Sequence, residues 1–372
     1  MRRFSLILTL VTLVGLLVTA CVAPAPTGAP AAEAPAAAGE EAPAAEAAPA
    51  GEPQELVVST WGFNQDLIDK NLTRPFEEKY NVKIVYETGN NSERLTKLIA
   101  RKDNPNVDVV HFAGSFTVRA LEEGVLQPID PSLLTHYDEL YDWAKDPIGQ
   151  NAGVGYAISS YLLIYRTDKI AEPITSWADL LREDVKGYVT VPDLATTNGP
   201  ATIVMLAKAF GGDIDNTEPA WERLPQLADQ IVTTYQRSSE LVSLFQQEEV
   251  WLAPYSSFAI GNLLETGLPL QRVIPVEGIP GTPSVVSIVA GSQKVDLAHK
   301  YIDFLISNEV QTAMALDLVD SPTNMTVEVP EDVAGLLTYG DEMINSLIFL
   351  DQAKLNAYQE EWLERWNEIM LK

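Results

Sequence analysis

Three apolar segments open the folded part of the chain: ELVVSTW (55–61), VKIVY (82–86) and VDVVHF (107–112). Each has the length and the Val-rich composition of a buried strand. Between them, residues 63–80 and 92–101 carry apolar side chains at helical spacing. This alternation of strand and helix predicts an α/β fold in which a central sheet is flanked by helices.

A second α/β series follows a strand predicted at 156–166, with further strands at 187–191 and 250–253. The 319 residues from Gln54 to Lys372 exceed the length of about 250–300 at which one core stops growing, so we expect two lobes. We assign residues 54–156 and 281–318 to lobe 1, and residues 157–280 and 319–372 to lobe 2. The strands that cross between the lobes, near 156–161 and 281–286, are the predicted hinge.

The N-terminus has the pattern of an export signal. Arg2 and Arg3 precede an apolar run that reaches Val18, and small residues then lead to Cys21. This order resembles a bacterial lipoprotein signal, which implies removal of residues 1–20 and lipid attachment at Cys21. The alternative is a transmembrane anchor, but the apolar run of about 15 residues is shorter than the ~20 that cross a bilayer.

Residues 21–53 have a different composition from the rest of the chain. After Cys21 this segment holds 15 Ala and 7 Pro, with no aromatic and no basic residue. Its apolar bulk is too small to offset the entropy lost on folding. We therefore expect a disordered tether between the lipid anchor and the folded body.

Composition excludes several classes of function. The chain has 25 basic and 52 acidic residues, a formal net charge of −27, which disfavours nucleic acid as a partner. Its only cysteine is Cys21, so disulfides and cysteine metal sites are absent. The three histidines lack metal-binding spacing, and no nucleophile motif or phosphate-binding glycine loop occurs. We expect no enzyme activity, no cofactor and no metal.

Several segments occur in an order that is typical of one family: Trp61-Gly62, Val109-Val110, TSWADL (175–180), Lys186-Gly187, FQQEEV (245–250), IPVEG (274–278) and YIDFLISNEV (301–310). With them the body resembles the extracytoplasmic solute-binding proteins of ABC importers, closest to the spermidine/putrescine-binding branch. The resemblance implies a two-lobed periplasmic-binding-protein fold of type II, with a small-molecule solute in the cleft and an ABC permease in the membrane as partner. We expect a monomer anchored by lipid outside the cytoplasmic membrane, at the cell surface or in the periplasm.

Candidate ligand-binding residues in lobe 1 follow predicted strand ends. Trp61 matches an aromatic residue that the family turns toward its solute, although a tryptophan of the core or rim is the alternative. Asn64 lies on the same loop. Ser115 and Phe116 open a helix after the third strand, where free backbone N–H groups can face a ligand, but a simple N-cap explains Ser115 equally well.

Lobe 2 offers a similar helix start. Thr196, Thr197 and Asn198 precede a Gly-Pro pair that is typical of the first turn of a helix, so amides there can meet an anionic group. The remaining candidates are Tyr161, Ser239, Tyr255 and Ser284.

The candidate cleft departs from the polyamine-binding pattern. The resemblance implies two acidic residues in the loop before that helix, but this chain has Leu194 and Thr197 there, and Thr282 and Ser284 replace a Trp and an Asp. A polycation would lose its charge partners, which is costly in a desolvated cleft. A neutral, zwitterionic or anionic solute is therefore favoured, although the net negative charge favours the approach of cations. The competing function is a tethered surface adhesin or scaffold with the same fold.

Overall fold

The computed structural model describes residues 52–370, which belong to one compact unit. The predicted signal peptide (1–20), the lipidation site Cys21 and almost all of the predicted tether lie outside the described residues. Within residues 52–370, no helix has the length and hydropathy needed to cross a membrane.

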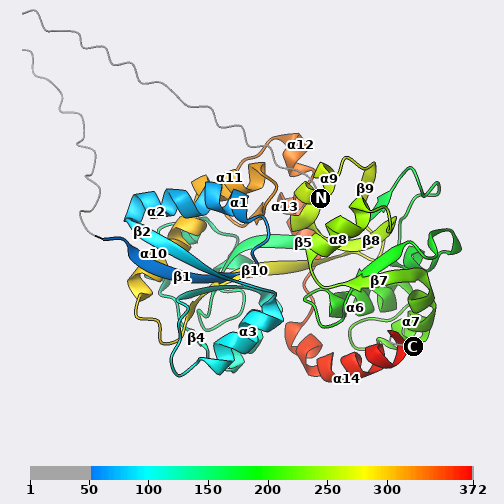
Figure 1. Ribbon diagram of the computed structural model, residues 1–372, viewed down its shortest axis with the longest axis horizontal. Coiled ribbons are helices and arrows are strands. Elements are labelled where there is room, and N and C mark those ends of the chain that lie inside the picture. Colours follow the sequence, from blue (N-terminus) through cyan, green and yellow to red (C-terminus); the bar gives the residue numbers. More distant parts are fainter. Residues whose placement is uncertain (1–51, 371–372) are drawn as a thin grey trace, which may run out of the picture. The chain divides into compact units, whose positions relative to one another are not determined.

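The strands between residues 52 and 370 form one twelve-stranded sheet, whose main path is β2-β1-β3-β10-β5-β8-β6-β7 (Figure 1). Their bounds are β1 Gln54–Thr60, β2 Val82–Thr88, β3 Val109–Ala113, β4 Leu126–Gln127, β5 Val154–Arg166, β6 Val189–Pro192, β7 Ile231–Tyr235, β8 Leu252–Ser256, β9 Leu270–Val273, β10 Ile279–Val289, β11 Ser321–Pro322 and β12 Leu347–Ile348. β1 is parallel to β2 and β3, and β6 is parallel to β7 and β8. The predicted α/β class is confirmed.

Two long strands join the halves of the sheet. The first half of β5 pairs with β10, and its second half pairs with β8 and β9. Ser160 lies opposite Gly281 and Ala157 lies opposite Ser284, with a β-bulge between Ser284 and Val285. A bulge bends the strand locally. We call the half that carries β1–β3 lobe 1 and the half that carries β6–β8 lobe 2; that β5 and β10 flex as a hinge remains a prediction.

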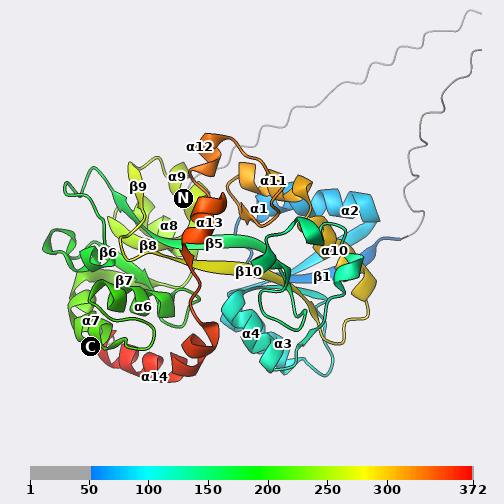
Figure 2. The same ribbon diagram turned by 180° about the vertical axis from the view of Figure 1, so that it is seen from behind.

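Helices cover both faces of the sheet (Figures 1 and 2). Their bounds are α1 Gln65–Ile68, α2 Arg74–Tyr80, α3 Asn91–Ala100, α4 Gly114–Glu122, α5 Asp142–Lys145, α6 Gly199–Ala209, α7 Glu218–Gln230, α8 Ser238–Gln246, α9 Ile260–Glu265, α10 Val295–Leu305, α11 Asn308–Leu316, α12 Glu331–Ala334, α13 Asp341–Ser346 and α14 Gln352–Met370. A π-helical turn, Asp69–Thr73, joins α1 to α2.

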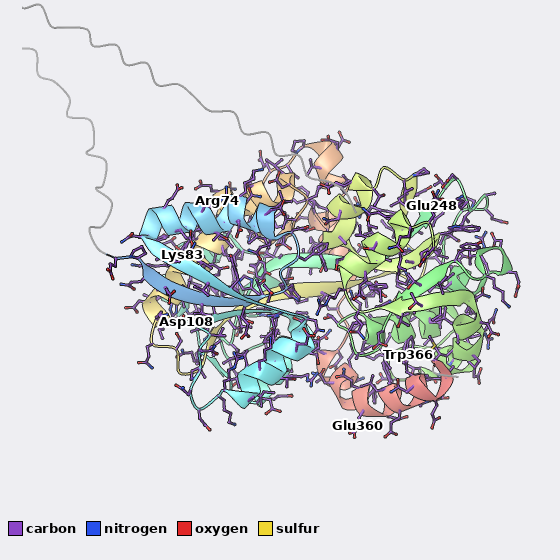
Figure 3. The ribbon with its side chains drawn as sticks, in the orientation of Figure 1. Arg74, Lys83, Asp108, Glu248, Glu360 and Trp366 are labelled. Atoms are coloured by element: carbon purple, nitrogen blue, oxygen red, sulfur yellow. The ribbon has the colours of Figure 1, made fainter. Side chains whose placement is uncertain are left out.

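The C-terminal helix α14 packs mainly on lobe 2. Trp362 and Trp366 are buried in the same core as Trp221 of α7, whereas Glu360 is on the solvent side of the helix (Figure 3). Near the start of α14, the Asn356 side chain donates a hydrogen bond to the Ser115 carbonyl of lobe 1 at 3.5 Å. The helix therefore contacts both lobes on the outside of the sheet.

Two elements differ from the sequence-based expectation. The apolar side chains of residues 297–318 have the spacing of one long helix, but this segment forms two helices, α10 and α11, because the Ser307 side chain caps α11 and ends the continuity. β7 was not expected, although its sequence IVTTY favours a strand; it lies at the edge of the sheet, with Val232 and Thr233 exposed.

The segment after α11 makes contacts that bear on the predicted lobe boundaries. Residues 319–327 were assigned to lobe 2, yet the Thr323 hydroxyl donates to the Gly155 carbonyl at 2.8 Å and the Asn324 amide donates to the Ile306 carbonyl at 3.0 Å. These bonds place the segment against the start of β5 and against α10. The exact division into lobes remains a prediction.

Candidate functional site

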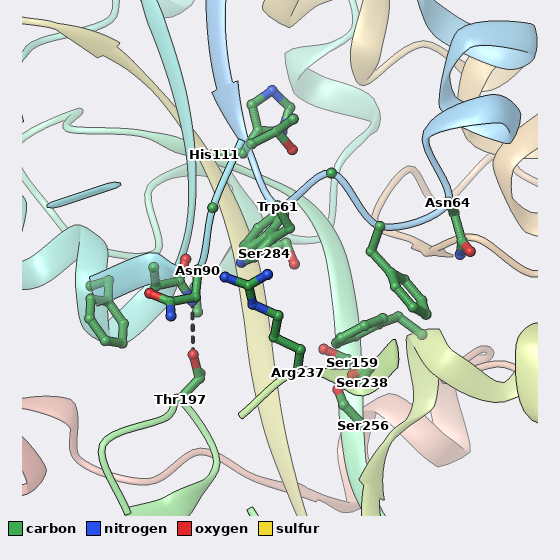
Figure 4. A pocket seen from close by; sticks show the side chains of 18 of the residues that line it. Trp61, Asn64, Asn90, His111, Ser159, Thr197, Arg237, Ser238, Ser256 and Ser284 are labelled. Carbon is green, nitrogen blue, oxygen red and sulfur yellow. Dashed lines mark hydrogen bonds between the residues drawn. The ribbon is translucent and has the colours of Figure 1, made fainter. Parts of the chain in front are cut away.

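A cavity of about 480 Å³ lies between the two lobes (Figure 4). Residues after β1, β3 and β6 line it, together with residues of β5 and β10. The carboxyl ends of strands in open α/β sheets are the usual place for ligands, and this volume suits a small organic solute.

Trp61 lines the lobe 1 wall directly after β1, and a buried arginine supports its ring. The guanidinium carbon of Arg94 lies 5.1 Å from the centroid of the Trp61 ring. Arg94 is fully buried and donates hydrogen bonds to the carbonyls of Gly89, Ser59 and His111 at 3.0, 3.2 and 2.6 Å. Burial lowers the pKa of Arg94 to about 9, so it stays charged at neutral pH. This one side chain ties β1, β3 and the loop before α3 together behind the wall.

His111 of β3, Tyr156 of β5 and Tyr301 of α10 continue the wall. The His111 ring centroid lies 4.9 Å from that of Tyr156 and 5.7 Å from that of Tyr301, and His111 Nε2 shares a hydrogen bond of 3.1 Å with the Tyr301 hydroxyl. Burial, with a smaller contribution from Arg94, lowers the pKa of His111 to about 3. Burial also raises the pKa of both tyrosines well above 10. This wall is therefore aromatic and uncharged at neutral pH.

Asp320 introduces a carboxylate next to this uncharged wall. It lies between α11 and β11, and it lines a small adjoining cavity together with Tyr156, Leu305 and Met314. Burial raises the pKa of Asp320 to about 7. No hydrogen bond or ion pair reaches its carboxylate from any residue between 52 and 370. The side chain is partly exposed, and its carboxylate has no partner of its own among these residues.

Lobe 2 contributes loops and helix starts rather than strand side chains. In the loop before α6, the Thr196 hydroxyl accepts a hydrogen bond from the Gly199 amide at 3.2 Å. A side chain at Gly199 would meet the Asp193 carbonyl oxygen and Leu194 Cα at 2.4 Å, so the tight turn requires glycine. Thr196, Thr197 and Asn198 line the cavity, so the loop itself faces it. The Gly199 amide is bonded to Thr196 and the Thr202 amide to the Asn198 carbonyl, and Pro200 has no N–H.

The second polar segment of lobe 2 precedes α8. Arg237 extends across the cavity toward Asn90, and Ser238 and Ser239 begin the helix (Figure 4). Ser256, at the end of β8, is 6% exposed and also lines the cavity. These groups give lobe 2 a wall rich in hydrogen-bond donors, with one cation.

Contacts across the opening hold the lobes together in this structure. They are the hydrogen bond from the Asn91 amide to the Thr197 hydroxyl at 2.8 Å, the approach of the Arg237 guanidinium to Glu93 at 3.4 Å, and the edge-to-face pair Phe63–Phe258 with centroids 5.6 Å apart (Figure 4). Each joins a lobe 1 residue to a lobe 2 residue. The structure is therefore a closed arrangement of the two lobes.

The structure brings most of the predicted site residues together. Those that line the cavity are Trp61, Asn64, Phe116, Thr196, Thr197, Asn198, Ser239 and Ser284. They come from both lobes and from the connecting strand β10. Their roles in ligand binding remain predictions.

Three predicted residues lie outside the cavity lining. The Tyr161 hydroxyl shares a hydrogen bond of 2.6 Å with Thr202 and is buried in the lobe 2 core. Tyr255 is fully buried on the other face of β8, and the neighbouring Ser256 lines the cavity instead. Ser115 lies on the side of α4 that contacts α14, while Phe116 lines the cavity.

Several lining residues were not predicted from sequence: Tyr86, Asn91, His111, Tyr156, Arg237, Ser256 and Asp320. The asparagine pair that precedes α3 carries a usable signal, because Asn90 and Glu93 form a capping box at that helix start. His111 and Tyr156 have no such signal, since both sit inside apolar strands and have the pattern of core residues.

Comparison with known proteins identifies the class. A crystal structure of an ABC transporter protein from Clostridium perfringens ATCC 13124 is 33% identical, with 85% of this chain and 99% of that chain covered and a TM-score of 0.70. The periplasmic binding protein AgtB from A. tumefaciens R10, in complex with agropinic acid, is 20% identical, with 86% and 99% covered and a TM-score of 0.72. The chain therefore has the two-lobed fold of type II periplasmic binding proteins.

The sequence profile described as bacterial extracellular solute-binding protein matches residues 71–335, and this chain belongs to that family. The spermidine/putrescine-binding periplasmic protein of Salmonella typhimurium LT2 is 26% identical over 269 residues, which are 69% of this chain and 75% of that protein. The family consists of extracytoplasmic proteins that bind solutes for ABC transporters and are not enzymes. The prediction of a solute-binding protein is confirmed at this level.

Proposed function

We propose that this protein is a lipid-anchored receptor that captures a neutral, zwitterionic or anionic small solute and delivers it to an ABC permease. The solute enters the cleft, contacts both lobes and stabilises the closed arrangement. The closed protein then docks on the permease. Cys21 and the segment that follows it hold the receptor near the membrane outside the cell or in the periplasm.

The presence of Arg237 in the cavity lining is the observation that supports this choice of solute most strongly. A polyamine would place one of its ammonium groups near this guanidinium. Of the three acidic residues in the lining, Glu93 accepts the Asn90 amide in a capping box and Asp193 accepts the Ala195 amide, so both already serve local structure. Asp320 is left as a single carboxylate without a partner among residues 52–370, which cannot match the two or more ammonium groups of a polyamine. The relatives show that the fold accepts varied solutes, since one is spermidine/putrescine-binding and another is bound to agropinic acid.

A thermal-shift panel tests the solute class. The purified protein is first freed of co-purified ligand by partial unfolding and refolding, and is then mixed with amino acids, aminoalkylphosphonates, oxyanions, sugars, thiamine or polyamines. A ligand at about 100 times its Kd adds about 2.7 kcal/mol to the free energy of unfolding, which raises the midpoint by several degrees. We expect the shift with a zwitterion, an anion or a neutral solute. A shift with polyamines alone would overturn the proposed specificity.

The lipid anchor is tested separately. A bacterial host that expresses the full chain is fed an alkyne-labelled fatty acid, and we expect label on the protein and its recovery with membranes. Cys21→Ala should lose both the label and the membrane association. Membrane recovery of the Cys21→Ala variant with its N-terminal segment intact would favour a transmembrane anchor instead.

If no solute in the panel raises the unfolding midpoint, the alternative function is favoured, a tethered adhesin or scaffold. That function requires no small-molecule response and no role for the cavity. Within residues 52–370, no contact or exposed surface favours it over solute capture.

A further inference from the structure

Two charged side chains of opposite sign line the cavity from different lobes, and the proposed function leaves their joint role open. Asp320 belongs to the lobe 1 side and Arg237 to lobe 2. We infer that they bind the two ends of one zwitterionic solute, with Asp320 receiving an ammonium group and Arg237 receiving a carboxylate or phosphonate. This inference rests on the proposed function and narrows the solute class.

The surroundings of Asp320 favour a cation as its partner. Of its neighbours in the adjoining cavity, Leu305 and Met314 offer no hydrogen bond, and the Gln311 amide already donates to the Tyr156 carbonyl and the Thr323 hydroxyl. A carboxylate held there without a partner raises the free energy of the folded protein. An ammonium group from the solute would supply the partner and remove this penalty. The aromatic wall formed by Tyr156 and Trp61 would add favourable contacts to a cation.

The groups around Asp320 do not supply the missing charge. The titratable and charged groups that face this region from neighbouring elements are Tyr86, His111, Tyr156, Tyr301, Arg94 and the Lys70–Asp317 ion pair. Arg94 already donates to three backbone carbonyls, and Lys70 is bound to Asp317 at 2.6 Å. The raised pKa of Asp320 agrees with an unmet partner.

The surroundings of Arg237 favour an anion. Its guanidinium is 54% exposed, and it lies 3.4 Å from Glu93, which is longer than a strong charge-assisted hydrogen bond. Arg237 can therefore turn to a ligand at little cost. Ser256, which is buried and whose hydroxyl has no hydrogen-bond partner among residues 52–370, lines the same cavity, as do Ser238 and Ser239 at the start of α8.

The placement of the two charges on different lobes links recognition to closure. A monovalent cation would satisfy Asp320 but leave Arg237 without a partner, and a simple carboxylate would do the reverse. A zwitterion satisfies both, so it alone gains charge contacts from each lobe when the cleft is closed. A diamine would direct its second ammonium group toward Arg237, which is repulsive.

Binding of matched probes by calorimetry tests the inference. The probes are amino carboxylates with one to four carbons between the charged groups, 2-aminoethylphosphonate, the corresponding diamines and simple carboxylates. We expect at least one zwitterion to bind best. Asp320→Asn should weaken it at least thirtyfold and Arg237→Gln at least tenfold. The controls are Glu309→Gln, an exposed acid on α11, and Arg223→Gln, a partly exposed arginine on α7, which should bind like the parent.

The pH dependence gives a second readout. Because the ammonium group requires ionised Asp320, whose pKa is about 7, affinity should fall about tenfold from pH 8 to pH 6 in the parent. The Asp320→Asn variant should show no such fall. Tyr86, His111, Tyr156 and Tyr301 keep their charge state over this range, since their pKa values lie near 12, near 3 or well above 10.

The outcomes separate this inference from the proposed function. If a sugar, an oxyanion or another solute binds tightly and neither Asp320→Asn nor Arg237→Gln changes its affinity, the inference is overturned and the solute-receptor function stands. If no solute in either panel binds, both fail. If only polyamines bind, the inference fails together with the proposed solute class.

Discussion

Lobe 1 and lobe 2 meet the cavity with different kinds of structure. Lobe 1 presents ring side chains from strands and strand ends, and the buried Arg94 holds their backbone in place. Lobe 2 presents a glycine-dependent turn, two helix starts and the half-exposed Arg237. A wall fixed by buried hydrogen bonds can change little without loss of stability, whereas a wall of loop residues can change its chemistry at low cost. We infer that lobe 1 provides the shape of the site, with Asp320 as its one charged contact to the solute, and that lobe 2 is the wall whose chemistry can change at low cost.

The largest expected effect is the loss of the lobe 1 support. Arg94→Met leaves three buried carbonyls without their donor, so we expect the free energy of unfolding to fall by about 3–5 kcal/mol in urea titrations. The control is Arg74→Met, because Arg74 is exposed on α2 and its loss should cost less than about 0.5 kcal/mol (Figure 3). A similar small cost for Arg94→Met would contradict the view that lobe 1 is the fixed wall.

A charge placed in the loop of lobe 2 should change binding rather than folding. Thr197→Glu puts a carboxylate at the start of α6, where it would compete with an anionic group of the solute. We expect affinity for an anionic or zwitterionic solute to fall at least a hundredfold, about 2.7 kcal/mol, in calorimetry. Thr197→Val, which removes only the hydrogen bond from Asn91, should weaken binding by a much smaller factor. Tighter binding of a polyamine by Thr197→Glu would instead restore the cationic specificity of the relatives.

The sequence was informative about lobe 2 and about strand ends, but less so about the interior of lobe 1. Trp61 and the residues 196–198 could be predicted because a strand end or a helix start is a local signal in the chain. His111 lies inside an apolar strand and resembles a core residue until the fold shows that it faces a cavity. Asp320 lies in the loop between α11 and β11, and it reaches the cavity because β11 pairs with the distant strand β5. No local sequence pattern indicates that long-range pairing.

Residues adjacent in sequence show a second limit. Ser115 and Phe116 were both predicted, as was Tyr255, but only Phe116 and the unpredicted Ser256 line the cavity. A shift of one residue turns a strand side chain to the opposite face, as for Tyr255 and Ser256, and turns a helical side chain by about 100°, as for Ser115 and Phe116. Sequence patterns placed the segments correctly but did not fix which of two neighbours points inward.

The cost of the unpaired carboxylate should appear as a pH dependence of stability. The pKa of Asp320 is about 7 in the folded protein and 3.8 without the fold, so the folded state binds more protons between these values. Stability due to this group is therefore present below pH 4 and is lost as pH rises through 7. The full shift corresponds to about 4 kcal/mol, and partial exposure of the side chain reduces our expectation to about 1–3 kcal/mol.

The substitution Asp320→Asn removes the ionisable group, and with it the loss of stability as the pH rises. The stability of the variant relative to the parent, measured by urea unfolding without ligand, should increase by about 1–3 kcal/mol between pH 4 and pH 8. Glu309→Gln serves as the control, because the same change of charge on an exposed site should give a flat difference. A difference for Asp320→Asn that is equally flat would show that the carboxylate is well solvated in the folded protein, and the aromatic wall of lobe 1 would then have no poorly solvated carboxylate beside it.

The smallest expected effect concerns the aromatic surface itself. Trp61→Ala removes a half-buried ring that lines the cavity but leaves Arg94 and its three carbonyl partners in place. We expect at least tenfold weaker solute binding, about 1.4 kcal/mol, with a smaller effect on the unfolding midpoint than Arg94→Met has. Trp251→Ala is the matched control, because Trp251 stacks on Tyr188 outside the cavity lining. If Trp61→Ala keeps full affinity, the solute must contact lobe 1 through His111 and the tyrosines and not through Trp61.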